Sequence, residues 1–244
     1  MLFDDRAKYF GLVFGVAFSA LLISQQSSFC VGLINTTPGV LYDVNEADIW
    51  VMDPRTETID SSVAMPEKAL GQVRGVAGVK WAVPFFKGNA TLQGADGLQQ
   101  VSSLFGVDES SLVGLPREMV AGSLESIRRP GAVFVDEAGY RLLWPGEPVR
   151  VDRVLEINDR RAIITGVVRS SPQFASNMAI FTTYKTALTL SPGGRQRLSF
   201  VLVGAEEGLN TEHVSQAISE KTGLRALPRG DFIGSTLLYF LRTT

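Results

Sequence analysis

The hydrophobic pattern of the chain is most uneven near the N-terminus, where a long uncharged segment predicts a transmembrane helix. No charged residue occurs over 9–42, and apolar residues fill 9–23 and most of 29–34 on either side of a short polar break. As one helix, 9–34 would be about 39 Å long at about 1.5 Å per residue. The hydrocarbon core of a bilayer is about 30 Å thick, so this helix can span it with tilt.

A cleaved signal peptide is the alternative interpretation, because the apolar region 9–23 has a suitable length. Apolar character resumes beyond the polar break and no small-residue cleavage site follows, which favours a retained helix. Arg6 and Lys8 precede the helix, and no Lys or Arg follows until Arg55. The positive-inside rule therefore predicts that 1–8 are cytoplasmic and that the domain after the helix lies outside the cytoplasm.

Two groups of residues inside this helix are candidates for contacts within the membrane. Gly11, Gly15 and Ser19 form a ridge of small residues on one face, which suits close packing of a second helix. Gln25 and Gln26 are polar, and a polar side chain in a bilayer needs a partner. They either contact a neighbouring helix or a translocation path, or lie near the outer interface, where water hydrates them.

The other end of the chain carries a second, shorter apolar run. Residues 232–241 are too few to span a membrane as a helix. We expect 231–244 to be the beginning of a second transmembrane helix in a longer protein, truncated here. A short amphipathic helix docked on the domain is the alternative.

Between these ends, strand and helix patterns alternate and predict an α+β domain over 35–230. It contains two strand–helix–strand units, the first beginning with a half-buried strand in which Ile49 and Val51 alternate with polar neighbours. Pro66 suits a helix start, and Gly223 suits a helix end. The predicted elements of the two units are, in order, 47–53, 65–79, 79–86, 197–206, 210–224 and 224–228.

A β-rich insertion is predicted over 98–177, where short strand candidates are separated by Gly and Pro. Asn158-Asp159, between two of these candidates, is typical of a hairpin turn. We expect the strand and short helix after the insertion to rejoin the first subdomain. The parts of this discontinuous subdomain would then be 43–97 and 178–230.

Composition and charge exclude several classes of function. The net charge is −2 and no basic block occurs, so nothing indicates nucleic acid binding. Cys30 is the single cysteine and His213 the single histidine, which argues against a disulfide and against a zinc site. The chain lacks a phosphate-binding P-loop and the usual hydrolase motifs. We therefore expect neither an enzyme nor a protein that holds a cofactor.

The whole chain resembles the first half of a permease of the MacB/FtsX-like family of ABC transporters, and within that family the DevC-type exporter permeases. The segments that carry the resemblance are AKYFGLVFGVAFSALLISQQSSFCVGL (7–33), DIWVMDP (48–54), VRGVAGVKWAVP (73–84) and LPRGDFIGSTLLYFLR (227–242). The resemblance implies four transmembrane helices in the full-length protein. It also implies a MacB-type periplasmic core domain between the first two helices, made of a porter-like α/β subdomain with a β-rich insertion.

The resemblance implies partners and a location as well. Such permeases lie in the inner (plasma) membrane, dimerise, and work with a separate ATPase subunit, a periplasmic adaptor and an outer-membrane channel to export a lipid or other amphipathic substrate. Two alternatives stay open at this point. One is an FtsX-like membrane regulator that binds a cell-wall enzyme and exports nothing, and the other is a secreted binding module.

Overall fold

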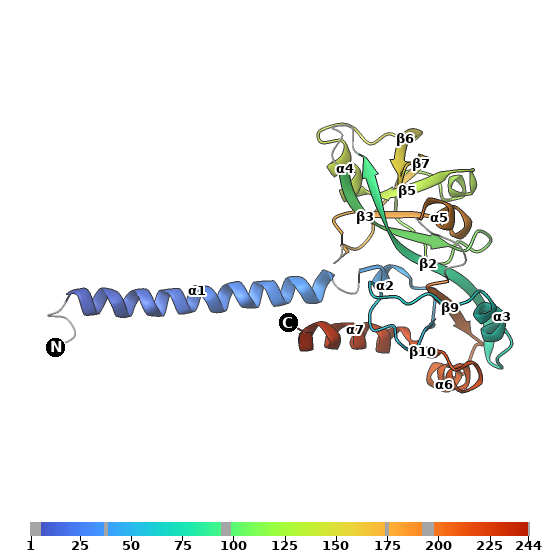
Figure 1. Ribbon diagram of the computed structural model, residues 1–244, viewed down its shortest axis with the longest axis horizontal. Coiled ribbons are helices and arrows are strands. Elements are labelled where there is room, and N and C mark those ends of the chain that lie inside the picture. Colours follow the sequence, from blue (N-terminus) through green and yellow to red (C-terminus); the bar gives the residue numbers. More distant parts are fainter. Residues whose placement is uncertain (1–5, 37–38, 94–98, 174–175, 192–197, 244) are drawn as a thin grey trace.

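An isolated N-terminal helix and a two-lobed domain make up the structure, a computed structural model (Figure 1). It describes residues 6–36, 39–93, 99–173, 176–191 and 198–243. Helix α1 (Arg6–Thr36) has 31 residues and projects from the domain as a rod. Among the described residues, one helix is long and apolar enough to cross a membrane, over Ala7–Phe29, and none of it is buried.

The first lobe is a four-stranded antiparallel sheet with two helices on one face. Its strand order is β10-β1-β9-β2, with a helix connecting β1 to β2 and another connecting β9 to β10. This is the ferredoxin-like arrangement of two β–α–β units. Its elements are α2 (Gly39–Asp43), β1 (Ile49–Met52), α3 (Lys68–Arg74), the first part of β2 (Val79–Gln93), β9 (Phe200–Ala205), α6 (Thr211–Thr222) and β10 (Arg225–Pro228).

Strand β1 was expected to be half-buried, and this expectation is wrong. All four of its residues are buried because both faces of the sheet are covered. Ile49 and Val51 pack with the residues of α3 and α6, whereas Trp50 and Met52 face an apolar cluster on the opposite side.

Helix ends in the first lobe follow the chemistry of their capping residues. Helix α6 begins where the Asn210 side chain accepts a hydrogen bond from the Glu212 N–H at 2.8 Å, and it ends at Gly223 with φ +70°. Helix α3 is shorter than predicted. Met65, expected inside it, instead forms a β-bridge with Leu198, and Gly78 turns the chain with φ +86°.

The second lobe is a six-stranded barrel. Going round it, β2 pairs with β3, β3 with β8, β8 with β5, β5 with β7, β7 with β6, and β6 with β2 again. Strand β4 (Met119–Gly122) adds to β7 outside this ring. The other elements are β3 (Gln99–Val107), the 3₁₀ helix η1 (Leu124–Arg128), β5 (Ala132–Asp136), α4 (Glu137–Leu143), β6 (Arg153–Ile157), β7 (Arg160–Val168), β8 (Ala179–Thr183) and α5 (Tyr184–Leu190).

The boundary between the lobes differs from the predicted one. The sequence suggested that 178–190 rejoins the first subdomain, but β8 pairs in parallel with β3 and antiparallel with β5. Helix α5 follows it and packs Ala187 and Leu190 into the apolar interior of the barrel. The barrel therefore needs this segment to close, and the return to the first lobe comes only with β9.

Strand β2 belongs to both lobes. Its 15 residues pair with β9 over Val79–Phe85 and with β3 over Phe86–Gln93. At about 3.3 Å per residue it is about 50 Å long. The two lobes are thus joined by a continuous strand.

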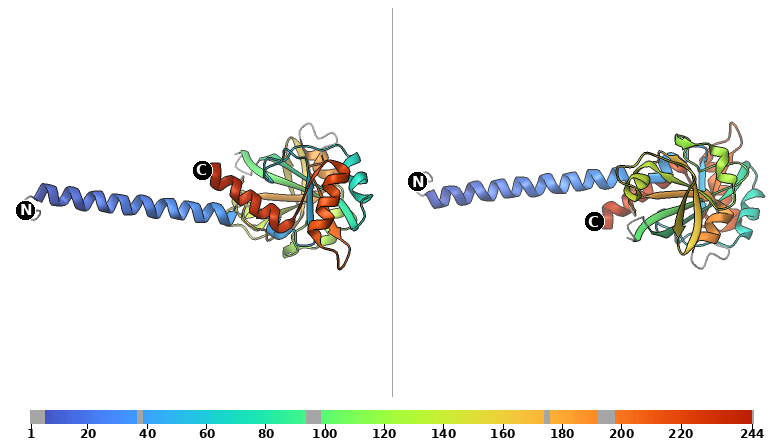
Figure 2. Two further views of the ribbon diagram at one scale, coloured as in Figure 1. Left: turned by 90° about the horizontal axis from the view of Figure 1, so that it is seen from below. Right: turned by 90° about the horizontal axis from the view of Figure 1, so that it is seen from above.

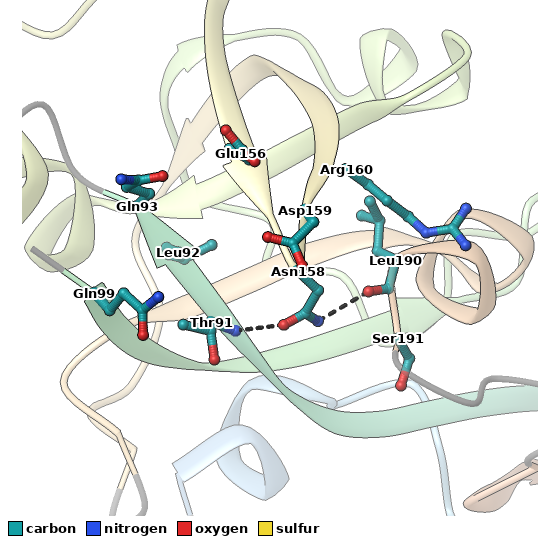
Figure 3. A pocket seen from close by; sticks show the side chains of 10 residues that line it. All are labelled: Thr91, Leu92, Gln93, Gln99, Glu156, Asn158, Asp159, Arg160, Leu190 and Ser191. Carbon is teal, nitrogen blue, oxygen red and sulfur yellow. Dashed lines mark hydrogen bonds between the residues drawn. The ribbon is translucent and has the colours of Figure 1, made fainter. Parts of the chain in front are cut away.

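The predicted hairpin turn at Asn158-Asp159 is confirmed, and it closes the barrel. Both residues have positive φ, 48° and 61°, as a two-residue type I′ turn requires. The Asn158 side chain accepts from the Thr91 N–H at 2.9 Å and donates to the Leu190 carbonyl at 2.9 Å (Figure 3). One side chain therefore joins the hairpin to β2 and to the end of α5.

Replacing Asn158 by Gly should lower the free energy of unfolding by about 1–3 kcal/mol, because Gly keeps the positive φ but loses both side-chain bonds. Thermal unfolding of the purified protein measures this. Asp159→Gly is the matched control, at the same turn and also at positive φ, and should change stability by less than about 0.5 kcal/mol. Equal effects of the two substitutions would contradict a role of Asn158 in barrel closure.

Candidate functional site

The candidate site is the base of the domain, where α1 arrives and α7 (Arg229–Thr243) leaves. Both helices extend from the same side of the domain, and the end of α7 points the same way as the start of α1 (Figures 1 and 2). Any movement of these helices reaches the domain through this base.

Helix α7 is fixed to the first lobe by its first turns. The Arg229 N–H donates to the Asp48 carbonyl at 2.9 Å. Phe232 is fully buried, with its ring centroid 5.8 Å from that of Trp50 and 6.0 Å from that of Phe200. Further along the helix, Leu238 is exposed and apolar. The helix thus begins docked on the sheet, as one of the two sequence interpretations expected, and continues as an exposed apolar segment.

The segment after α1 is fixed to both lobes. Val40 and Leu41 of α2 are fully buried. The Asp43 carboxylate accepts two hydrogen bonds from Ser171 in the barrel lobe, from the N–H at 2.9 Å and from the hydroxyl at 2.7 Å. Burial raises the pKa of Asp43, while these two bonds act in the opposite direction. A side chain on Gly39 would come within 3 Å of the loop that carries Ser171, so α2 packs directly on that loop.

A chain of aromatic rings runs from α7 into the barrel. The centroid distances are 5.8 Å from Phe232 to Trp50, 5.5 Å from Trp50 to Phe85, 6.0 Å from Phe85 to Phe105 and 5.2 Å from Phe105 to Phe181. These rings belong to α7, β1, β2, β3 and β8. They lie in a single apolar cluster that also contains the buried residues of α2. Packed interiors transmit displacement because they contain little free space.

The small-residue ridge of α1 lies away from the domain. An added Cβ at Gly11 or Gly15 meets no atom within 4 Å, so this face of the helix is open. The Ser19 hydroxyl donates to the Gly15 carbonyl at 2.8 Å and is satisfied within the helix. Gln25 and Gln26 are also exposed, within about 6 Å along the axis of the Phe29 end of the apolar span.

The sequence did not identify the contacts at the base. Neither Trp50 nor Asp43 is singled out by a local pattern. An acidic residue directly after a long uncharged segment was the available signal for Asp43. Its partner Ser171 is distant in sequence, so no local pattern joins the two.

Titratable side chains and hollows of the described residues were candidates for a chemical site. No group of His, Cys, Asp and Glu side chains there could hold a metal ion. His213 is exposed on α6. A polar hollow of about 400 Å³ lies beside the barrel-closing turn and includes Gln93, Gln99 and Glu156 (Figure 3). Its polar side chains can form hydrogen bonds with a ligand.

Asp136 is the most perturbed carboxyl group of the barrel lobe. It precedes α4 and accepts from the Gly139 N–H at 3.3 Å and the Ala179 N–H at 2.8 Å, both at the same oxygen. Burial nevertheless raises its pKa from 3.8 to about 6. These bonds join β5, α4 and the start of β8, so the role of Asp136 is structural.

Comparison with known proteins connects this architecture to one family. The sequence profile of the MacB-like periplasmic core domain matches residues 10–221. The periplasmic region of MacB from Actinobacillus actinomycetemcomitans is 13% identical with a TM-score of 0.57, covering 81% of this chain and 97% of its own. The extracellular domain of the ABC-type transporter YknZ from Gram-positive bacteria is 14% identical with a TM-score of 0.54, covering 74% and 98%. No curated protein matches the chain.

Phe232→Ala should destabilise the domain by about 3–5 kcal/mol, because it removes a buried ring from the contact between α7 and β1. Chemical or thermal unfolding in detergent measures the loss. Leu238→Ala on the exposed part of the same helix is the control and should cost less than about 0.5 kcal/mol. If both substitutions cost the same, α7 is not fixed through Phe232.

The stability of the protein should depend on pH through Asp136. Because its pKa is raised on folding, the protonated form favours the folded state. The stabilisation of the folded state by protonated Asp136 is complete below about pH 4 and is lost as the pH rises through about 6. Asp136→Asn keeps the acceptor oxygen without the charge. Relative to this variant, the wild type should lose on the order of 3 kcal/mol between about pH 4 and pH 7. Parallel profiles of the two proteins would contradict the assignment.

Proposed function

Because the chain belongs to the MacB-like periplasmic core domain family, we propose that it is the permease subunit of an ABC-type exporter that couples a separate ATPase to its extracytoplasmic domain. The family match covers 10–221, which is most of the chain. The family supports an ABC-transporter-type permease in the inner membrane. The coupling to an ATPase, the substrate and the partners are our proposal.

One observation supports coupling more than any other. The segment after α1 and the first turns of α7 pack into the same apolar cluster, and that cluster extends into both lobes. A cytoplasmic motor can act on this domain only through the helices that cross the membrane. A shift of α2 or α7 would therefore move a packed core.

The proposal includes the wider assembly. The N-terminus would face the cytoplasm and the two-lobed domain the periplasm, in agreement with Arg6 and Lys8 before the apolar helix. The full-length protein would form a homodimer, bind the ATPase subunit, and meet a periplasmic adaptor and an outer-membrane channel, as in DevC-type systems. The cargo would be a lipid or another amphipathic molecule. We propose that the chain catalyses no reaction itself.

Asp43→Ala tests this function, because it removes the two hydrogen bonds from α2, the helix that follows α1, to the barrel lobe. In the full-length protein with its ATPase and adaptor, export should fall about 2- to 30-fold, the range of 0.5–2 kcal/mol of coupling energy. ATP hydrolysis should continue. Asp152→Ala, which removes an exposed ion pair with Arg129, is the control and should export normally.

Deletion of the gene separates the exporter from the FtsX-like regulator. Loss of lipid or drug export, together with co-purification of an adaptor and a channel, supports the exporter. Unchanged export with altered septation or cell-wall turnover would overturn it in favour of the regulator.

A further inference from the structure

A basic groove lies on the barrel lobe, away from the base of the domain. It has a volume of about 460 Å³ and lies between the turn before β5, the start of β7 and helix α5. Three of the residues that line it are cationic: Arg160, Arg161 and Lys185. Thr186 and Thr189 add hydroxyl groups on the α5 side.

Arg160 and Arg161 differ from most arginines of this lobe because their side chains have no ionic or hydrogen-bonded partner among the described residues. Only Arg150 shares this property there. The arginines of the lobe with a partner are Arg117, Arg128, Arg129, Arg141, Arg153 and Arg169. The chain has 25 acidic residues against 23 basic ones, so carboxylates are not scarce. Two of the three unpaired arginines therefore share one groove.

The acidic side chains beside this groove form no ion pair with its arginines among the described residues. Glu156 is opposite Arg161 in the β6–β7 ladder and Asp159 precedes Arg160, and both line the neighbouring polar hollow, which Arg160 also lines. In Figure 3 the Arg160 guanidinium points toward α5 and away from Glu156. Lys185 has one exposed pair, with Glu109 at 3.2 Å. Such exposed pairs are weak and are exchanged easily.

From this arrangement we infer that the groove binds a phosphate group. Guanidinium groups present planar forks of donors that match phosphate oxygens, and the Lys185 ammonium and the Thr186 hydroxyl can satisfy the remaining oxygens. The Thr189 hydroxyl donates to the Lys185 carbonyl within α5. The volume is sufficient for a phosphorylated small molecule or a lipid headgroup.

The position of α5 limits how the ligand arrives. In Figures 1 and 2 this helix lies on the side of the domain away from α1. A headgroup in the membrane that α1 would cross cannot reach the groove. The phosphate must therefore come from a soluble compound or from a lipid carried out of the bilayer. The inference does not depend on the proposed export function.

Isothermal titration calorimetry with the full chain in neutral detergent tests the inference. One arm uses glycerol phosphate, and the other uses monomeric dihexanoyl phosphatidylglycerol, with dihexanoyl phosphatidylcholine as the comparison lipid. Arg160→Gln and Arg161→Gln should each weaken binding about tenfold, because each removes a charge-assisted hydrogen bond. Arg150→Gln is the matched control, since Arg150 is also exposed and unpaired in the described structure but lies outside the groove.

Binding in either arm that is weakened by the two groove substitutions and not by Arg150→Gln supports the inference. The arm that binds more tightly then identifies the source of the phosphate. No binding in both arms would overturn it, and so would binding that all three substitutions weaken equally. Circular dichroism spectra of the variants should be unchanged, because the side chains of Arg160 and Arg161 are exposed.

Discussion

The packing of the Trp50 indole among Phe85, Phe200 and Phe232 is the contact on which the rest of the domain depends. The indole is fully buried, and two of its ring contacts are close to perpendicular, at 76°. Aromatic pairs of this kind contribute about 0.5–1.5 kcal/mol each beyond their burial. The four rings belong to β1, β2, β9 and α7. The same contact therefore joins the central strands of the first lobe and fixes the departing helix.

From this cluster the structure extends in two directions. Toward the base, Asp43 and its two bonds to Ser171 hold the segment after α1 against the barrel lobe. Away from the base, Phe105 and Phe181 continue the aromatic chain into the barrel. The proposed coupling uses both connections, because the segment after α1 bonds to the barrel lobe through Asp43 and α7 joins the aromatic chain through Phe232. A connection made only of hydrogen-bonded loops would deform more easily than these packed side chains and would transmit less movement to the second lobe.

Much of the fold could be predicted from local patterns. Helix α6 and the Asn158-Asp159 turn were identified correctly because their signals are contained in a few adjacent residues. The burial of β1 and the membership of β8 could not be predicted in this way. Both depend on strands distant in sequence that cover a second face or complete a ring. Within the described residues, two residue pairs between β2 and β6 close the barrel, and no periodicity reveals them.

The candidate site could be predicted only in part, because it too depends on contacts between residues distant in sequence. The long apolar segment of α1 can be read directly, and so can the small residues on its face. Which side chains fix the helices to the domain is decided by three-dimensional neighbours. Ser171 lies 128 residues after Asp43, and Phe232 is far in sequence from Trp50. The basic groove is formed in the same way, by a turn, a hairpin and a helix that meet only in the closed barrel.

The continuous strand β2 has a mechanical consequence. A strand that is hydrogen-bonded to β9 at one end and to β3 at the other acts as a stiff beam. The two ladders meet at Phe85 and Phe86 with no unpaired residue between them, so β2 has no gap between the lobes where it could bend freely. The domain should therefore tilt as one lever about its base, so that a small rotation of α7 is magnified into a larger sweep at the tip of the barrel.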